Sequence, residues 1–348
     1  MRKQNKKQER MRKSVSLPKI VFGTSSLGNL FVELDSSTKN QLVQAAVENS
    51  PTTPLFDSAG KYGAGLALES LAAGLKALNV DPKDVKISNK LGWKRVPLTT
   101  AEPTFEPGAW INLQHDAVQD ISYQGILDCY HQGNELLGEY ESQIVSIHDP
   151  DEYLAAATDD EDLCKRKQDI LDAYKALMEL RDAGKVESVG VGAKDVNVID
   201  FISDHIQLDW AMFACSVTPY THKASTIALL KKLGNQGVGV INSAVFNAGF
   251  LLGSDNFDYK KINRQSHPQE FLWRDKFNAL CEEFCVMPAE VCVQFSFLFD
   301  EIKAIALSSS SPKRVKSNIS LAQAKVPKSF WLAMREQGLI SIDLDNIT

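Results

Sequence analysis

Short apolar runs alternate with longer amphipathic stretches along most of the chain. The short runs have the length and β-branched content of buried strands, and the longer stretches repeat their apolar positions with a helical period. The predicted strands are residues 20–23, 55–57, 85–90, 144–148, 186–192, 210–214, 238–242 and 304–308. The predicted helices include residues 39–49, 66–78, 124–137, 167–183, 224–233 and 273–284.

This alternation predicts a parallel sheet of the α/β class, and eight strands fit a closed (β/α)8 TIM barrel better than an open sheet. No repeat, low-complexity segment or linker divides residues 17–348, so we expect a single domain. Two long βα loops, at residues 92–120 and 253–269, show little periodicity. In a barrel such loops lie at the C-terminal face, where active sites are found.

The charge is unevenly distributed along the 348 residues. Residues 1–16 hold seven Lys or Arg and one Glu, a net +6, which leaves −12 for the rest of a chain whose formal charge is −6. The basic run has almost no apolar residues, which predicts a disordered, solvated tail, with contact to an anionic surface or nucleic acid as the alternative. The acidic remainder argues against nucleic acid as a partner.

Targeting and metal patterns are absent from the sequence. The basic run has no apolar region of a signal peptide, and no stretch reaches the ~18 apolar residues of a membrane span, so we expect a cytoplasmic protein. The cysteines form no CxxC pair and no zinc pattern, which predicts buried, reduced thiols and no metal site. The cysteines are residues 129, 164, 215, 281, 285 and 292.

Four polar residues follow or end three consecutive predicted strands. Asp57 ends the second strand with Tyr62 five residues later, Lys90 ends the third, and His148 ends the fourth. The strand ends of a barrel share one mouth, so these groups are expected to converge. A lysine cation lowers the pKa of a nearby phenol, a carboxylate holds the lysine, and a histidine orients a substrate oxygen. Taken singly, Asp57 also fits a strand-end cap and His148 a structural histidine.

The segments FDSAGKYG, ISNKLGW and SIHDPDEY, in this order, resemble the signature blocks of the aldo-keto reductases. The resemblance extends from about Leu17 to Leu321. It implies a (β/α)8 barrel that binds a nicotinamide cofactor without a Rossmann fold or a metal. It also implies roles: Tyr62 as the proton donor or acceptor, Lys90 and Asp57 as the pair that tunes it, and His148 as the residue that orients the substrate.

Within this family, softer blocks resemble the sugar 1-dehydrogenases that act on D-threo-aldoses, L-fucose or L-galactose. These blocks include GTSSLG at 23–28, YGAG at 62–65 and SAVFNAG at 243–249. The expected reaction is NAD(P)-dependent oxidation of an aldose at C1 to the lactone. Two alternatives remain, an NADPH-dependent aldehyde or ketone reductase with pyridoxal-like substrates, and an NAD(P)-sensing binding protein with little turnover. The expected protein is a monomer or weak homo-oligomer that acts on a small molecule.

The cofactor is predicted near the C-terminus, where a serine run precedes Pro312 and opens a helix. Free backbone N–H groups at a helix N-terminus bind phosphate, although a serine run in isolation more often serves as a solvated helix cap. The resemblance favours the cofactor, NAD in preference to NADP. The cofactor-binding residues that it implies are Gly23, Thr24, Lys194, Ser216, Asn247, Gly249, Leu251, Ser308, Ser309, Ser310, Arg314 and Asn318.

Three positions depart from the family pattern. Ser308 stands where many NADPH-preferring members carry lysine, Lys194 where asparagine is usual, and Val217 where an aromatic residue stacks on the nicotinamide. In the long loop, Trp93, Phe105 and Trp110 are expected to form an apolar wall for the substrate, although ordinary loop packing explains each of them equally well.

Overall fold

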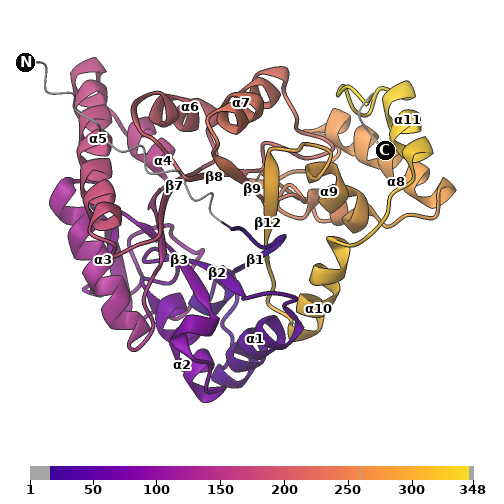
Figure 1. The fold of residues 1–348 in the computed structure, drawn as a ribbon. Helices are drawn as coiled ribbons and strands as arrows, with labels where there is room; N and C mark the ends of the chain where they lie inside the picture. The colour runs from indigo at the N-terminus through magenta and orange to yellow at the C-terminus, as the bar shows by residue number, and fades with distance from the viewer. Residues whose placement is uncertain (1–15, 259, 345–348) are drawn as a thin grey trace, which may run out of the picture.

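The computed structural model describes residues 16–258 and 260–344. Within these residues, eight parallel strands close into a barrel in the order β1, β12, β9, β8, β7, β6, β3, β2. Helices surround this barrel (Figure 1). The predicted (β/α)8 fold is therefore confirmed. The barrel strands are β1 (Ile20–Gly23), β2 (Leu55–Ala59), β3 (Lys86–Leu91), β6 (Ile144–His148), β7 (Ser188–Ala193), β8 (Trp210–Ala214), β9 (Gly239–Ser243) and β12 (Ile302–Ser308).

The helices follow the strands along the chain. The α-helices are α1 (Ser36–Asn49), α2 (Leu66–Ala77), α3 (Tyr123–Leu137), α4 (Pro150–Ala155), α5 (Asp160–Asp182), α6 (Val196–His205), α7 (Ala224–Asn235), α8 (Pro268–Glu283), α9 (Pro288–Ser296), α10 (Pro312–Leu321) and α11 (Lys328–Glu336). Short 3₁₀ helices are η1 (Ser25–Gly28), η2 (Pro82–Asp84) and η3 (Phe250–Leu252). Outside the barrel, β4 (Trp93–Pro97) pairs with β5 (His115–Gln119), and β10 (Asn256–Phe257) with β11 (Lys260–Lys261).

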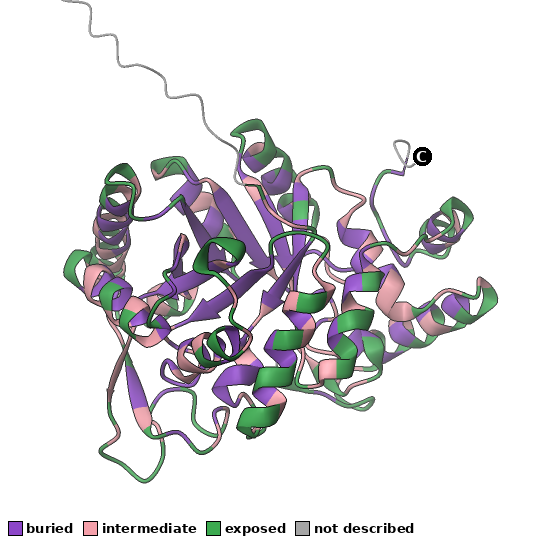
Figure 2. Cartoon of the chain, turned by 60° about the horizontal axis from the view of Figure 1, so that its bottom comes forward, coloured by how far each residue is buried: buried purple, intermediate pink, exposed green. Residues whose placement is uncertain are grey.

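The strands are buried on both faces, which explains their continuous apolar runs. Figure 2 shows buried strands inside helices whose outer faces are exposed. One face packs in the barrel interior, where the Trp210 ring fills space that only a glycine leaves open. A Cβ on Gly190 of β7 would lie 2.2 Å from that ring. The interior cluster is Val21, Leu55, Ile144, Trp210, Met212, Ile241, Ala304 and Ala306.

The predicted starts of three helices were wrong. α1 begins at Ser36 and not at residue 39, and α8 begins at Pro268 and not at residue 273. The largest difference is at α5. α5 begins at Asp160, whereas apolar periodicity predicted a start at residue 167. The Asp159 side chain caps the helix by accepting from the Asp162 N–H. The Arg166–Asp162 ion pair, four residues apart, then supports the polar first turns. Capping and charge therefore extend this helix beyond its apolar stripe.

The loop of residues 92–120 was also predicted wrongly as irregular throughout. β4 and β5 form an antiparallel hairpin within it, which leaves residues 98–114 as the loop proper, here called the mouth loop. Arg95 holds the hairpin against α2, because its guanidinium donates to both carboxylate oxygens of Glu69 at 2.8 and 2.7 Å. These strands carry mixed polar and apolar residues, so their pairing depends on tertiary contacts.

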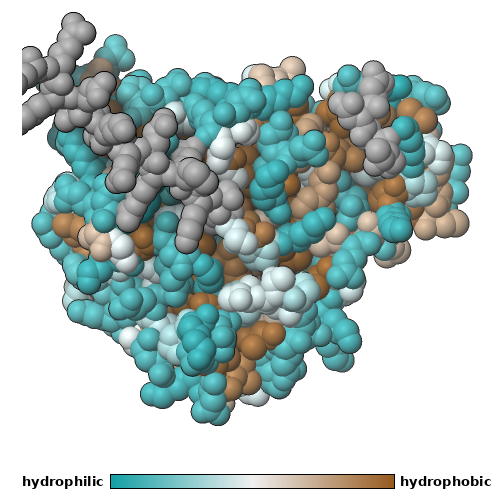
Figure 3. Space-filling model, viewed as in Figure 1, coloured by the Kyte–Doolittle hydropathy of each residue, from teal (hydrophilic) through white to brown (hydrophobic). Residues whose placement is uncertain are grey.

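The cysteines are free thiols. Cys129, Cys215, Cys281 and Cys292 are buried as expected, but Cys164 and Cys285 are exposed, which corrects the prediction for those two. The face of the molecule in Figure 3 is largely hydrophilic, with hydrophobic residues in separate patches. No helix in the described part of the chain is both long and apolar enough to cross a membrane.

Candidate active site

Asp57 and Lys90 form a buried ion pair between adjacent strands. Asp57 lies in β2 and Lys90 in β3, and the Lys90 ammonium donates to Asp57 Oδ2 at 2.5 Å. Both side chains are at most 5% exposed. The Ser88 hydroxyl donates to the other carboxylate oxygen at 3.3 Å. The carboxylate therefore fixes the position of the lysine, while the predicted tuning role of this pair stays a prediction.

Tyr62 lies beside this pair in the loop after β2. The Lys90 ammonium is 4.7 Å from the centre of the Tyr62 ring, and the His148 ring packs edge-on at 5.4 Å between centroids. His148 is the last residue of β6, which neighbours β3 in the barrel. The structure therefore brings all four residues to one point at the carboxyl ends of three adjacent strands, while their catalytic roles stay predictions.

Two glycines, one packed against Tyr62 and one directly after it, allow the tight backbone conformation at Tyr62. A Cβ on Gly28 would lie 2.7 Å from the Tyr62 carbonyl carbon, so η1 packs directly against this loop. Gly63 has a φ of +62°, a conformation that L side chains rarely adopt. The Tyr62 N–H donates to the Ala59 carbonyl at 3.1 Å. This tight turn directs Tyr62 back over the end of the barrel.

Burial and charge oppose each other at Tyr62. Burial raises the pKa of Tyr62 above its ordinary value of 10.0, and the Asp57 and Asp149 carboxylates add to this rise. The Lys90 ammonium lowers this pKa, but burial and the carboxylates together outweigh it. Burial lowers the pKa of Lys90, whereas the Asp57 carboxylate and Tyr62 raise it by more, so this lysine is a cation. The phenol is therefore protonated at neutral pH, with its proton close to a fixed positive charge.

His148 is a neutral imidazole at neutral pH. Burial lowers its pKa well below 6.5, and the nearby cations Lys90 and Lys61 lower it further. Within the described residues its Nδ1 has no hydrogen-bond partner, and its Nε2 lies 3.6 Å from Asp149 Oδ1. A neutral imidazole can donate or accept one hydrogen bond, so His148 is suited to bind a substrate hydroxyl or carbonyl oxygen.

The three aromatic residues predicted as a substrate wall form one cluster. Trp110 lies 5.8 Å from Tyr62 between ring centroids, Phe105 lies 6.2 Å from Trp110, and Trp93 lies 5.9 Å from Phe105. Phe105 and Trp110 are each 6% exposed. Trp110 is therefore the member beside the candidate proton donor, and the other two pack behind it.

Sequence reasoning missed a charged cluster next to Tyr62. The Lys61 ammonium donates to Asp149 Oδ2 at 2.6 Å and to Glu152 Oε2 at 3.0 Å, and it lies 2.8 Å from Glu106 Oε1. Lys61, Asp149 and Glu152 all fall inside the segments that carry the family resemblance. Their opposite charges in two segments predicted to meet at the mouth were the available signal.

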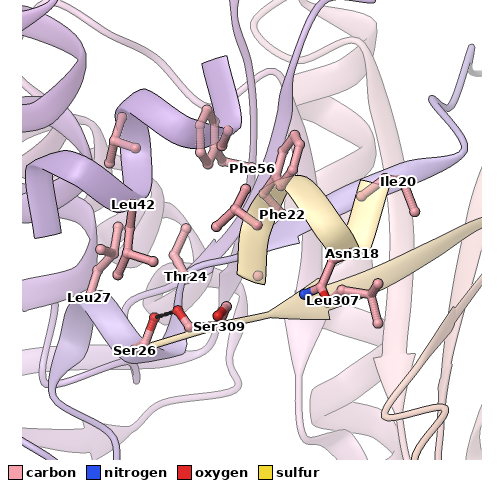
Figure 4. Close-up of a pocket in the computed structure, with 14 residues that line it drawn as sticks. Ile20, Phe22, Thr24, Ser26, Leu27, Leu42, Phe56, Leu307, Ser309 and Asn318 are labelled. Carbon is pink, nitrogen blue, oxygen red and sulfur yellow. Dashed lines mark hydrogen bonds between the residues drawn. The ribbon is translucent and has the colours of Figure 1, made fainter. Parts of the chain in front are cut away.

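The predicted cofactor residues at the two ends of the chain meet between β1 and β12. Gly23, Thr24, Ser309 and Asn318 line one pocket, and the Ser26 hydroxyl donates to the Ser309 carbonyl at 2.7 Å (Figure 4). The hydroxyls of neighbouring Ser25 and Ser308 lie 3.1 Å apart. The carboxyl ends of these two paired strands therefore carry a row of hydroxyl groups.

The start of α10 presents groups that fit a phosphate-containing cofactor. Ser308, Ser310 and Arg314 are exposed, and the helix begins at Pro312 as predicted. A helix N-terminus, hydroxyls and one guanidinium together bind phosphate oxygens well. These residues therefore fit the pyrophosphate and adenosine end of a nicotinamide dinucleotide.

The remaining predicted cofactor residues have different surroundings. Lys194 pairs with Asp258 at 2.7 Å, and the Ser216 hydroxyl donates to the Lys194 carbonyl at 3.2 Å. Gly249 has a φ of +94° and precedes η3, and Leu251 is buried in the core. Asn247 is buried and accepts from the Thr218 hydroxyl at 2.6 Å. The Asn247 side chain is therefore already hydrogen-bonded within the protein, and the Leu251 side chain is packed in its core.

Two further structural observations bear on the cofactor. Val217, which stands where an aromatic residue was expected, is fully buried in the hydrophobic core. Across residues 16–258 and 260–344, no group of three or more His, Cys, Asp or Glu side chains is arranged to hold a metal ion.

Residues 19–337 match the Aldo/keto reductase family. Pyridoxal 4-dehydrogenase from Microbacterium luteolum is 24% identical over 345 residues, which cover 95% of this chain and 96% of that protein. L-galactose dehydrogenase from Arabidopsis thaliana is 21% identical over 303 residues, which cover 86% and 82%.

Solved structures show the same fold. An aldo-keto reductase from Bacillus halodurans in its holo form has a TM-score of 0.67 at 17% identity, covering 93% of this chain and 92% of that one. The glycerol dehydrogenase of Gluconobacter oxydans has a TM-score of 0.65 at 17% identity, covering 95% of each chain. At these identities the likeness supports the fold alone.

Proposed function

The chain belongs to the aldo/keto reductase family of NAD(P)-dependent oxidoreductases, and we propose that it oxidises an aldose at C1 to the lactone. The observation that carries this proposal is the group of Asp57, Tyr62, Lys90 and His148 at the mouth, with Lys90 bound to Asp57 at 2.5 Å. The L-galactose dehydrogenase relative supports a sugar as the substrate.

In this reaction Tyr62 exchanges the proton. The bound nicotinamide supplies the hydride acceptor. Tyr62 in its phenolate form takes the proton of the anomeric hydroxyl as the C1–H bond breaks and the lactone carbonyl forms. Lys90 favours that phenolate by its charge, and neutral His148 hydrogen-bonds the sugar oxygen. Water outside the site removes the proton from Tyr62 before the next turnover.

The proposed cofactor is NAD, with NADP as a weaker ligand. Ser308, Ser310 and Arg314 are exposed at the start of α10 and would hold the adenosine end. At the start of α10, Ser308 supplies a hydroxyl where a second cation would strengthen binding of a 2′-phosphate. The Arg314 guanidinium alone favours NADP over NAD only weakly. Thr24 and Asn318 would lie against the same ligand, since they line the pocket beside Ser309.

A second candidate reaction is oxidoreduction of an aldehyde on an aromatic ring. The relative from Microbacterium luteolum is a pyridoxal 4-dehydrogenase and covers 95% of this chain. The Trp110 indole beside Tyr62 supports either substrate, because an aromatic face packs against a flat ring as well as against the apolar face of a sugar. In the reductive direction Tyr62 donates the proton to the new alcohol.

The test is an absorbance assay at 340 nm with L-galactose, L-fucose, pyridoxal and glycerol, each with NAD+ and NADP+, and with pyridoxal and NADPH for the reductive direction. We expect the highest kcat/KM with an aldose and NAD+. Greater turnover of pyridoxal would replace the sugar proposal with the second candidate. Tight cofactor binding with no turnover of any of the four would contradict both and support a sensing role. Tyr62→Phe is the control that identifies background activity.

A further inference from the structure

Lys61 occupies an unusual place for a cation, because its side chain is only 3% exposed. It comes from the loop after β2, directly before Tyr62, and its ammonium meets carboxylates from two other elements. One is Glu106 of the mouth loop at 2.8 Å, and another is Asp149, directly before α4, at 2.6 Å. The ammonium also lies 4.7 Å from the centre of the Trp93 ring.

Glu106 connects the Lys61 ammonium to the Trp110 indole. While one carboxylate oxygen meets the Lys61 ammonium, the other accepts from the Trp110 indole N–H at 2.6 Å. Trp110 in turn lies 5.8 Å from Tyr62 between ring centroids. Glu106 has a φ of +45°, which a residue with a side chain adopts only where its surroundings compensate the strain. The ion pair and the indole hydrogen bond are those surroundings.

Asp149 makes the second connection. It accepts from Lys61 through Oδ2, while its Oδ1 lies 3.6 Å from His148 Nε2. Asp149 also has a positive φ, +52°, which turns the chain sharply between β6 and α4. A single ammonium thus joins the two segments that carry Trp110 and His148, whose rings both pack against Tyr62.

The rest of the mouth loop is held by other contacts. The Phe31 N–H donates to the Ala109 carbonyl at 2.7 Å, and the Ile111 N–H to the Asn29 carbonyl at 3.1 Å. At the other side, Thr104 donates through its N–H and hydroxyl to Asp116. Glu106 lies between these two anchors, and its carboxylate is held by the Lys61 ammonium and the Trp110 indole.

We propose that Lys61 is a positioning residue that holds the mouth loop closed through Glu106, so that Trp110 forms the substrate wall beside Tyr62 and Asp149 stays next to His148. The proposal rests on the proposed function only where it gives Trp110 a role in substrate binding, since the loop and its contacts exist in the protein without ligands. Burial lowers the pKa of Lys61, but Asp149 and Glu106 raise it by more, so the ammonium stays charged.

The experiment compares Lys61→Met and Glu106→Gln with wild type, and uses Lys232→Met as a matched control. Lys232 of α7 also shares its ammonium between two carboxylates, Asp200 and Asp204, at 2.5 and 2.6 Å, but it lies on the helical layer outside the barrel. Hydrogen exchange of residues 98–114 is measured first, in the protein without cofactor or substrate. The best aldose or aldehyde from the panel is then used for kcat and KM.

We expect exchange in the mouth loop to be about 5- to 30-fold faster in Lys61→Met and Glu106→Gln, and unchanged in Lys232→Met. We expect kcat/KM to fall by up to about 100-fold, with KM changing more than kcat, because the wall moves while the reacting groups stay. The double variant should resemble Lys61→Met, since Glu106→Gln weakens a connection that Lys61→Met already breaks.

Unchanged exchange and unchanged KM in a folded Lys61→Met would overturn the proposal. So would additive effects of the two substitutions. If Lys61→Met does not fold because it leaves carboxylates unpaired, Glu106→Gln decides alone, since Asp149 and Glu152 still pair with Lys61 there. A wild type that turns over none of the panel refutes the proposed function, while the exchange data still test the role of Lys61.

Discussion

The two sides of the barrel mouth are built differently. On the side of β2, β3 and β6, the charged groups Asp57, Lys90 and Lys61 beside Tyr62 and His148 are buried and paired, with side-chain exposures of 3–5%. On the side of β12 and α10, Ser308, Ser310 and Arg314 are exposed. Charges fixed in a buried site act on a reaction more strongly than groups in water. Substitutions on the first side should therefore change rates, and substitutions on the second should change binding by small factors.

The largest expected effect separates the two sides directly. Tyr62→Phe removes one hydroxyl and keeps the ring that packs against Trp110 and His148. We expect kcat to fall by about 10²–10⁴-fold, because general acid–base catalysis contributes a factor of this size. The Kd for NAD+, measured by quenching of tryptophan fluorescence, should stay close to wild type. A variant that keeps more than about a tenth of the wild-type kcat would exclude Tyr62 as the proton-transfer residue.

Lys90→Met tests the fixed charge on the same side. Burial raises the pKa of Tyr62 and Lys90 opposes that rise, so losing the ammonium should raise this pKa further. Oxidation needs the phenolate, and the alkaline rise of kcat/KM should therefore move to higher pH, with activity at neutral pH reduced by about 10²-fold or more. The measurement is the pH profile of kcat/KM.

The Lys90→Met variant also leaves the Asp57 carboxylate buried without its cation, which costs about 3–5 kcal/mol. Thermal unfolding therefore accompanies the kinetics, and Lys90→Arg keeps the charge as a control. An active Lys90→Met with a pH profile of unchanged shape would make Lys90 a structural residue only.

Protonation of His148 is expected to have a smaller effect, which appears in the pH dependence of the free energy of unfolding. Its pKa in the folded protein lies well below the ordinary 6.5, through burial and the charges of Lys90 and Lys61. Below pH 6.5 the unfolded chain therefore binds a proton that the folded protein does not. Stability is full above pH 6.5 and should fall as the pH decreases towards the folded value, by up to about 1.4 kcal/mol per pH unit.

Urea unfolding of wild type and His148→Asn between pH 5 and 7 measures this contribution. Other titrating groups affect both proteins equally, so the difference between the two slopes belongs to position 148. Parallel slopes would show that the imidazole titrates alike in the folded and unfolded states, contrary to its burial.

The two sides also differ in how far the sequence predicted them. The bounds of Ile20–Gly23, Ile144–His148 and Trp210–Ala214 were predicted correctly, because fully buried parallel strands appear as unbroken apolar runs. Asp57, Lys90 and His148 lie in β2, β3 and β6, which the same kind of run identified with bounds within two residues, and their convergence follows because a barrel directs all strand ends to one mouth. Lys61 and Glu106 do not, because their contact depends on the path of a loop that has no periodic pattern.

The direction of the Tyr62 pKa shift shows the same limit. The sequence identified the lysine that lowers this pKa, but not the burial that, together with the carboxylates, outweighs it. Burial of a loop tyrosine comes from the packing of Gly28 and of the mouth loop around it. On the open side, by contrast, the serine run and the Pro312 helix start were predicted, because caps and helix termini depend on local sequence.

The smallest expected effect concerns cofactor choice on the open side. Arg314 is the cation predicted to contact the adenosine end, and Ser308 donates or accepts one hydrogen bond with Ser25 at 3.1 Å. An exposed ion pair changes an equilibrium constant by no more than about fivefold. One such pair with a 2′-phosphate therefore gives NADP+ too little advantage to dominate, and we expect NAD+ to bind more tightly by a modest factor.

Ser308→Lys adds the second cation, and Arg314→Ala removes the first. We expect the Kd for NADP+ to fall up to about fivefold in Ser308→Lys and to rise by a similar factor in Arg314→Ala, with the Kd for NAD+ nearly unchanged in both. Ser308→Ala separates the new charge from the lost hydroxyl. Wild-type binding of NADP+ ten times tighter than NAD+ would reverse the preference. It would also show that this side holds charge as firmly as the catalytic side, because an exposed pair cannot produce so large a factor.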